Sequence, residues 1–238
     1  MKSLLVNKII MTDRIELSSI LEKGSGIYTF LNPVSYLNAL KHKSIFSEFE
    51  GIFADGGLLV KTINLLYHQN VKRLSFDMGS MAPVVFREAM RLKKSIAIVA
   101  TKQNLLEIAI MTLKDIYPEL NIIYFHSGYF DSEQEINVAV QKIVELHPDI
   151  LIVGMGIIKQ EKCLLKVKHA GFKGLGFTCG GFIHQLAQNK KDYYPKWINE
   201  HGLRFIYRIY KEPHTRKRYF KAAFLFPIRF LFEKITGI

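Results

Sequence analysis

Short apolar runs alternate with longer amphipathic stretches between residues 95 and 178. The runs are rich in β-branched and aromatic side chains and predict buried strands at Ser95–Ala100, Asn121–Phe125, Asp149–Val153 and Lys173–Thr178. The stretches between them have the length and periodicity of helices, at Asn104–Tyr117, Glu133–Leu146 and Lys159–Ala170. Strands and helices that alternate in this way form right-handed βαβ units. The pattern therefore predicts an α/β fold, a Rossmann-like parallel sheet flanked by helices.

The first 70 residues predict a smaller α/β arrangement. Strands are expected at Ser3–Ile10 and Gly26–Leu31, and helices at Arg14–Glu22, Pro33–Lys41 and Leu58–His68. Pro33 is well placed in the first turn of its helix, and the two glycines after Asp55 indicate a turn. We expect this arrangement and the βαβ units to form one α/β core over residues 1–200.

The last 38 residues are more basic than the rest of the chain. Residues 201–238 hold nine Lys or Arg and two Glu, more than half of the net charge of +12. Two helices, Gly202–Tyr210 and Thr215–Ile235, are expected to form a basic helical appendage. The second mixes aromatic and cationic side chains, as helices on anionic membranes do, and Pro227 would kink or divide it. The alternative is an ordinary amphipathic helix packed on the core.

Composition fits a globular protein with one sizeable core, at 49% hydrophobic and 23% charged residues over a length of 238. The two cysteines, Cys163 and Cys179, give no disulfide framework, which favours a reducing cytoplasm. The N-terminal residues lack the pattern of a signal peptide, and no apolar stretch approaches the roughly 20 residues that span a bilayer. We expect a cytoplasmic protein, peripheral on the inner face of the cell membrane.

Asp55 is the first candidate for chemistry. It stands between an apolar run and two glycines, where a turn can present its carboxylate as a general base. The alternative is an ordinary turn, because Asp-Gly is a common turn pair.

Ligands of parallel sheets bind beyond the carboxyl ends of the strands. This rule places four segments around one crevice: Thr101-Lys102, Ser127–Tyr129, Gly154–Glu161 and Cys179–Phe182. A helix that opens after Gly156 favours an anion, so Lys159 could meet a diphosphate and Gln160 a sugar hydroxyl. The alternative for this turn, and for the glycine pair Gly180-Gly181, is close packing of strand and helix.

Metal and covalent chemistry find little support in the sequence. The histidines are scattered, no Asp-x-Asp pair suggests a metal-bound nucleotide sugar, and no serine stands in a Gly-x-Ser-x-Gly elbow. We expect no metal and no cofactor.

Several of these segments resemble the WecG/TagA/CpsF family, glycosyltransferase family 26. The similar segments are TFLNPVSYLNAL near residue 29, ADGGLLV at 54, RLSFDMGSMAP at 73, HSGYF at 126, VGMGIIKQE at 153, CGGFIHQLA at 179 and DYYPKWINEHGLRFIYRIYKEPHTRKRY from 192. The resemblance implies an inverting, metal-independent enzyme that moves a sugar, often of the N-acetylmannosamine type, from UDP to a polyprenyl-diphosphate-linked acceptor. Such enzymes build teichoic acid, capsule or other cell-surface polysaccharide.

The resemblance also implies roles for particular residues. The family's catalytic aspartate matches Asp55. The substrate-binding residues that we expect on this basis and from the turns are Thr29, Asn32, Tyr129, Gly156, Lys159, Gln160, Glu161, Gly180, Gly181, Arg204, Arg208, Arg216 and Arg218. With no metal, the arginines and a helix N-terminus would stabilise the leaving diphosphate.

Three departures from the family pattern leave the donor sugar open. Ile158 stands where many members have proline, His184 where many have aspartate, and VATKQN replaces a glycine-rich turn after residue 95. They motivate one alternative, a non-catalytic partner subunit of a glycosyltransferase. The basic charge motivates another, a nucleic-acid-binding module, although we expect no nucleic acid as partner. Assembly into a homo-oligomer stays open.

Overall fold

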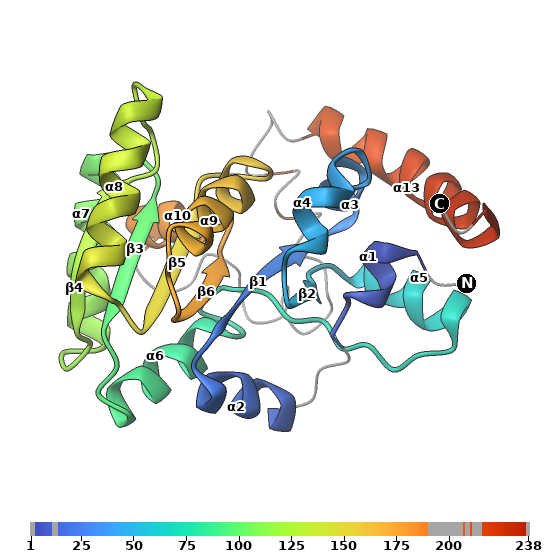
Figure 1. The fold of residues 1–238 in the computed structure, drawn as a ribbon. Helices are drawn as coiled ribbons and strands as arrows, with labels where there is room; N and C mark the ends of the chain where they lie inside the picture. Colours follow the sequence, from blue (N-terminus) through green and yellow to red (C-terminus); the bar gives the residue numbers. More distant parts are fainter. Residues whose placement is uncertain (1–2, 11–13, 190–206, 208–209, 211–215, 237–238) are drawn as a thin grey trace. The chain divides into compact units, whose positions relative to one another are not determined.

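The computed structural model describes residues 3–10, 14–189, 207, 210 and 216–236 (Figure 1). Its six strands are β1 (Gly26–Leu31), β2 (Gly51–Ala54), β3 (Ile96–Ala100), β4 (Ile122–Ser127), β5 (Ile150–Gly154) and β6 (Leu175–Thr178). They form one sheet in the order β2-β1-β6-β5-β3-β4, and the pairings from β1 to β4 are parallel. The predicted α/β fold with a parallel sheet is confirmed.

The chain divides into two compact units, which we describe separately. The first unit contains residues 1–13, 30–75 and 194–238, and the second contains residues 14–29 and 76–193. The expected boundary at residue 200 lies outside the described residues, so it stays a prediction.

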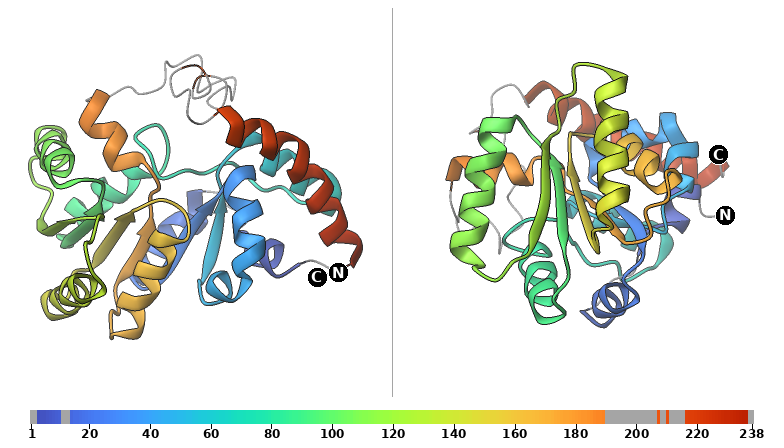
Figure 2. Two further views of the ribbon diagram at one scale, coloured as in Figure 1. Left: turned by 90° about the horizontal axis from the view of Figure 1, so that it is seen from above. Right: turned by 60° about the vertical axis from the view of Figure 1, so that its left-hand side comes forward.

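The second unit holds the βαβ repeats. All five residues of β3 and of β5 are buried, whereas burial alternates along β4, as expected for central strands and an edge strand. Helices α7 (Gln103–Ile116) and α10 (Phe182–Asn189) pack on each other, as do α8 (Glu133–Leu146) and α9 (Lys159–His169), and the two pairs cover opposite faces of the sheet (Figure 2). The expected helices between residues 104 and 170 are confirmed to within a residue or so at each end.

The direction of winding changes between β3 and β5. From β3 the chain passes through α7 to β4 on one side, and then returns through α8 to β5 on the other side of β3. In open α/β sheets, this switch point at the carboxyl ends of the strands is where ligands bind. It places Thr101 beside Gly154, since Thr101 N donates to the Gly154 carbonyl over 3.2 Å.

Two further helices belong to the second unit, α2 (Arg14–Lys23), which was expected, and α6 (Ala82–Arg91), which was not. Ala82, Val85, Phe86 and Ala89 of α6 are buried, at the spacing of one helical face. The periodic signal for this helix was therefore present in the sequence.

The first unit contains α1 (Leu4–Asn7), α3 (Pro33–Ala39), η1 (Leu40–His42), α4 (Lys43–Ser47), α5 (Gly57–Tyr67) and α13 (Arg216–Thr236). The strand predicted at Ser3–Ile10 is wrong. Ser3 Oγ accepts from Val6 N and caps α1, and only Ile9 forms an isolated bridge, with Ile52. A serine cap before a run of leucines starts a helix here, because the cap satisfies a backbone donor that a strand would pair elsewhere.

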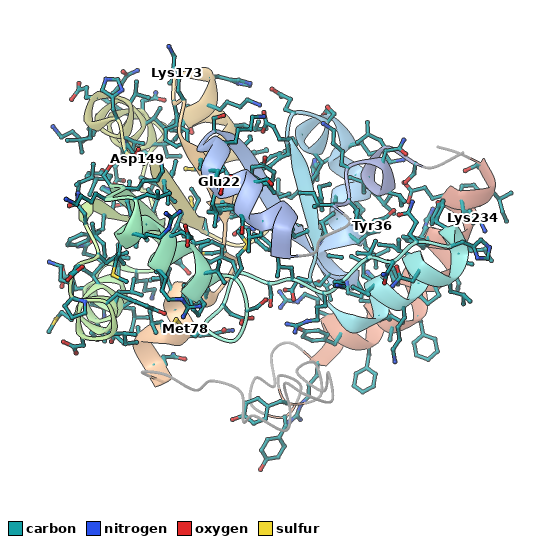
Figure 3. All side chains as sticks on the ribbon, turned by 90° about the horizontal axis from the view of Figure 1, so that it is seen from below. Glu22, Tyr36, Met78, Asp149, Lys173 and Lys234 are labelled. Atoms are coloured by element: carbon teal, nitrogen blue, oxygen red, sulfur yellow. The ribbon has the colours of Figure 1, made fainter. Side chains whose placement is uncertain are left out.

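The C-terminal helix α13 is continuous through Pro227, so Pro227 does not divide it, and the alternative of a kink stays a prediction. Pro227 lies on the exposed side, whereas Phe226 and Phe230 are buried against Tyr36 of α3. Tyr36 is labelled in Figure 3. The other helix predicted in the appendage, Gly202–Tyr210, falls almost entirely outside the described residues.

Candidate active site

A buried polar cluster joins β1, β6 and the start of α9 in the second unit. Thr29, Thr178 and Glu161 are fully buried and Gln160 is 4% exposed. Thr29 Oγ1 donates to Glu161 Oε1 over 2.9 Å, and Gln160 Nε2 donates to the same oxygen over 2.8 Å. The other carboxylate oxygen, Oε2, accepts from Ile158 N over 2.6 Å. Glu161 thus holds the loop after β5 against β1.

The direction of each hydrogen bond in this cluster follows from the donors available. Thr29 has one hydroxyl proton and gives it to Glu161, so Thr178 Oγ1 must donate to Thr29 Oγ1, 2.8 Å away. Gln160 Oε1 accepts from Gly180 N over 3.0 Å, which ties α9 to the turn after β6. The second N–H of the Gln160 amide takes no part in these bonds.

Burial sets the protonation of Glu161. It raises the pKa of the Glu161 carboxyl, and the bonds from Gln160, Thr29 and Ile158 only partly oppose this rise. Because the carboxylate is inaccessible, it positions Gln160 and the loop in this conformation instead of meeting a ligand itself.

The loop after β5 leaves backbone exposed where α9 begins. Gly156 has a φ of +79° and an added Cβ there would meet nothing within 4 Å. Ile158 also has a positive φ, +69°, which costs energy for a β-branched residue and is held by the bond to Glu161. Lys159 is exposed at the first turn of α9, where its ammonium and the helix N-terminus both favour an anion.

The glycines near the carboxyl ends of the strands differ in the space around their Cα atoms. A Cβ on Gly154 would lie 2.7 Å from Cys179 Sγ and 2.9 Å from the Gly180 carbonyl, and one on Gly128 would lie 2.9 Å from Met155 Cγ. These two glycines serve close packing. Gly180, with a φ of +56° and open space at its Cα, and the exposed Gly181 instead leave room beside the sheet.

Tyr129 and His184 also lie near the carboxyl ends of the strands. Tyr129 is 63% exposed, and Lys102 Nζ lies 6.0 Å from the centre of its ring. Thr101, with a positive φ of +40°, pairs its hydroxyl with His184 Nδ1 at 3.1 Å. His184, which stands where many family members have aspartate, therefore bonds to a residue at the switch point.

Asp55 lies in the first unit, on the turn between β2 and α5. Its backbone N donates to the Leu31 carbonyl over 2.7 Å, which fixes the turn against β1. The side chain is 33% exposed, and Oδ1 lies 3.4 Å from Arg73 Nη2. Arg73 Nη2 also donates to Ser75 Oγ over 2.8 Å, so the guanidinium is held on the carboxylate. A half-buried, positioned carboxylate of this kind can accept a proton from an alcohol.

Asn32 supports the same turn. Its Oδ1 accepts from Val34 N and Ser35 N, each over 3.0 Å, and its backbone N donates to Ser35 Oγ, so Asn32 caps α3. A Cβ on Gly56 would lie 3.4 Å from Asn32 Cβ and 3.2 Å from Pro33 Cδ. The glycine after Asp55 is thus required by close packing on the start of α3, and by its own φ of +133°.

The predicted arginines fall in the appendage. Arg216 and Arg218 are exposed in the first turn of α13, and Arg204 and Arg208 lie outside the described residues. Within the described part of the chain, no group of three or more potential ligands could hold a metal. No helix among these same residues is long and apolar enough to cross a bilayer.

A hollow of about 410 Å³ lies elsewhere in the second unit, between β4 and α8. Its lining includes Tyr124, His126, Glu135 and Lys142 and contains none of the predicted site residues. The candidate site is therefore defined by side-chain chemistry and not by this hollow.

Residues 5–237 match the family described as "Glycosyl transferase WecG/TagA/CpsF family". The chain belongs to this family. The predicted family is confirmed, and the family and the relatives below identify the chain as a glycosyltransferase.

Two relatives show the range of reactions in the WecG/TagA/CpsF family. The UDP-Gal:alpha-D-GlcNAc-diphosphoundecaprenol beta-1,4-galactosyltransferase of Shigella boydii is 36% identical over 225 residues, 94% of each chain. The N-acetylglucosaminyldiphosphoundecaprenol N-acetyl-beta-D-mannosaminyltransferase of Bacillus subtilis strain 168 is 25% identical over 214 residues, 87% of this chain and 79% of the relative. Both names specify the same lipid-linked acceptor and different sugars.

For this WecG/TagA/CpsF member, the structure groups the predicted residues by unit. Thr29, Gln160, Glu161 and Gly180 are directly linked in the second unit, and Asn32 packs beside the Asp55 turn in the first. Arg73 is the residue that the sequence analysis missed. It stood at the head of the quoted RLSFDMGSMAP segment, where no local pattern connected it with Asp55.

Proposed function

We propose that this protein transfers a hexose, with inversion, from a UDP-sugar to N-acetylglucosamine on diphosphoundecaprenol. The observation that carries the proposal is the Asp55 carboxylate, one third exposed on its turn and 3.4 Å from Arg73. The names of the relatives, at 36% and 25% identity, supply the acceptor class. The reaction would serve the assembly of a bacterial cell-surface polysaccharide.

In the proposed step, Asp55 accepts the proton of the attacking acceptor hydroxyl as general base. The acceptor oxygen forms a bond to the anomeric carbon from the face opposite UDP, and the bond from that carbon to the diphosphate oxygen breaks. UDP leaves with the bonding electron pair. Arg73, 3.4 Å from Oδ1, holds the carboxylate in position for this proton transfer.

The leaving UDP needs positive charge and backbone donors. Lys159 and the N-terminus of α9 supply both at the carboxyl edge of the second unit. Arg216 and Arg218 are exposed on α13 and add two cations, and Arg204 and Arg208, outside the described residues, are proposed to add two more.

Galactose is the first donor sugar to test. The relative that uses UDP-Gal by name is 36% identical over nearly the whole chain, and the mannosaminyltransferases of the two Bacillus species are 25% and 23% identical. The departures at Ile158 and His184 also argue against assuming the N-acetylmannosamine-type donor that the resemblance implied.

The partner surface is an anionic membrane on the cytoplasmic side. On α13, Phe224, Ile228 and Ile235 are each more than 60% exposed, and Lys217 and Lys221 fall on the same side of the helix. Apolar side chains in the lipid boundary with lysines at the headgroups are typical of an interfacial helix. Such docking would bring the enzyme to its lipid-linked acceptor.

The test is a transfer assay with a panel of UDP-sugars and N-acetylglucosamine on a polyprenyl diphosphate. We expect product with UDP-galactose and a β-linkage by NMR. The Asp55→Asn variant is the control and should form product at least roughly a hundredfold more slowly while it still binds UDP. Absence of turnover with every UDP-sugar would support a non-catalytic partner subunit and contradict the proposal.

A further inference from the structure

Helix α13 carries apolar side chains on two opposite faces. The buried face presents Ala222, Phe226 and Phe230, each at most 3% exposed. The outer face presents large apolar side chains that are all more than a third exposed: Phe220, Phe224, Leu225, Ile228, Leu231, Phe232 and Ile235. At roughly 100° per residue, the centres of the two faces lie about 180° apart. Burial of apolar area alone therefore does not decide which face packs on the first unit.

One polar side chain distinguishes the two faces. Glu233 lies on the buried face and is 3% exposed. Its Oε2 accepts from the Tyr36 hydroxyl over 2.6 Å, and its Oε1 lies 3.4 Å from Lys43 Nζ. A helix turned by half a rotation would lose both contacts and leave the Tyr36 hydroxyl buried without its acceptor.

The surroundings of Glu233 are aromatic and closely packed. The Tyr36 ring lies 5.5 Å from Phe226 and 5.2 Å from Phe230, and Phe230 lies 5.9 Å from Tyr67, all measured between ring centres (Tyr36 is labelled in Figure 3). Burial, followed by the charge of Glu233, raises the pKa of Tyr36, so the phenol keeps the proton that it donates. The Glu233 carboxylate thus occupies one well-defined position.

A second phenol beside Glu233 provides a matched comparison. Burial and the charge of Glu233 also raise the pKa of Tyr67. The Tyr67 hydroxyl, however, is buried and has no hydrogen-bond partner among the residues that the structure describes. Both tyrosines contact the Phe230 ring, and only Tyr36 bonds to Glu233, so substitution of Tyr67 tests the effect of losing a nearby phenol without losing that bond.

We propose that Glu233 is a positioning residue that fixes the rotation of α13, so that the face of Phe224, Ile228 and Ile235 points outward to an anionic bilayer. Buried polar groups set the register of helices in this way when the apolar contacts are ambiguous. The inference deepens the proposed function and rests on it for the identity of the partner. The rotation itself concerns only contacts within the first unit.

Cysteine reporters test the rotation without any membrane. The two native thiols react slowly, because both are buried and burial raises the pKa of Cys163 to about 11 and of Cys179 to about 12. In the native background, the thiol of Phe224→Cys should react with a maleimide about tenfold or more faster than that of Ala222→Cys. Adding Glu233→Leu should bring the ratio of the two rates toward one or below.

The two tyrosines supply the controls for this ratio. Tyr36→Phe removes the bond to Glu233 and should lower the ratio several-fold, whereas Tyr67→Phe should leave it unchanged. Thermal melting of each variant confirms that it folds. An unchanged ratio in Glu233→Leu would overturn the proposal. So would a rise of both rates together, because that result means detachment of the helix and not rotation.

Sedimentation with vesicles separates this inference from the proposed function. The native protein should sediment with vesicles of anionic phospholipid, and Glu233→Leu should bind several-fold more weakly while Tyr67→Phe binds normally. If the native protein does not sediment, the membrane part of the proposed function fails, and the rate ratio still decides the role of Glu233. Equal sedimentation of native protein and Glu233→Leu, with a changed ratio, would remove the bilayer as the partner of the outer face.

Discussion

Two carboxylates among the predicted site residues, Glu161 of the second unit and Asp55 of the first, stand in opposite environments. Glu161 is fully buried and accepts three hydrogen bonds, from Thr29, Gln160 and Ile158. Asp55 is one third exposed and faces Arg73 across 3.4 Å. A satisfied, inaccessible carboxylate stabilises a loop, whereas an exposed one beside a cation is available to a substrate. The difference predicts that substitutions at Glu161 lower stability and substitutions at Asp55 lower turnover.

The largest effect is expected from Asp55→Asn. The amide keeps the shape of the side chain and cannot accept the proton, so kcat should fall by roughly 10²–10⁴-fold, the usual contribution of a general base. The melting temperature should move little, because a half-exposed ion pair contributes about 0–1 kcal/mol. Transfer kinetics and calorimetry on one preparation measure both, and full activity in the variant would remove Asp55 from the mechanism.

Glu161→Ala should show the reverse behaviour. It leaves the Thr29 hydroxyl and a Gln160 N–H buried without an acceptor, and the half-buried Ile158 N loses its acceptor as well, at a cost of about 1–3 kcal/mol for each buried unsatisfied group. We expect a loss of several kcal/mol in the free energy of unfolding, measured in urea. Thr178→Val, which removes one donor at the edge of the same cluster, should cost about 1 kcal/mol. Equal stability of Glu161→Ala and the native protein would show that the cluster does not form.

Arg73 sharpens the role of Asp55. Arg73→Gln removes the cation that holds the Asp55 side chain in position, and we expect kcat/KM to fall about tenfold, corresponding to a loss of about 1.4 kcal/mol in transition-state stabilisation. Arg91→Gln, which breaks an exposed pair with Glu88, is the matched control and should leave kcat/KM unchanged. Equal kcat/KM in Arg73→Gln and the native protein would contradict this role of Arg73.

The smallest effect is the pH dependence that Glu161 gives to stability. Its folded pKa lies above the usual value of 4.5, so the native state binds the proton more tightly than the unfolded state. The stability from this group is therefore fully present below the unfolded pKa and is lost as pH rises through the folded pKa. Urea unfolding at pH 4 and at pH 7 should show this loss in the native protein and a smaller one in Glu161→Gln. An identical pH dependence of stability in both proteins would show that Glu161 is not its source.

The sequence predicted the second unit better than the first. The βαβ repeats were recognisable because each buried strand is a continuous apolar run and each helix carries a periodic face. Ser3–Ile10 was misread because a short apolar run fits a strand and a capped helix equally well, and the choice depended on a hydrogen bond from Val6 to Ser3. The helix at Ala82–Arg91 was missed although its periodicity was present.

For the site, residue types were easier to predict than their environments. Lys159, Gln160 and Glu161 form one polar run, yet the first is exposed and the other two are buried. Their separation depends on Thr29 and Thr178, which lie far away in the sequence and meet them only in the folded sheet. No local pattern encodes such a contact. The pairing of Arg73 with Asp55 could not be predicted for the same reason, because the two residues are 18 positions apart in the sequence.

The glycines at the carboxyl edge limit how this scaffold can acquire new substrates. Gly154 has no room for even a methyl group, since a Cβ would lie 2.7 Å from Cys179 Sγ. Mutation of Gly154 to any larger residue would therefore force its neighbours to move. Gly156 and Gly180 have open space, but both have a positive φ, which penalises most replacements except asparagine and aspartate. Directed evolution of donor preference should therefore succeed sooner at Tyr129 and His184, whose backbones tolerate many side chains.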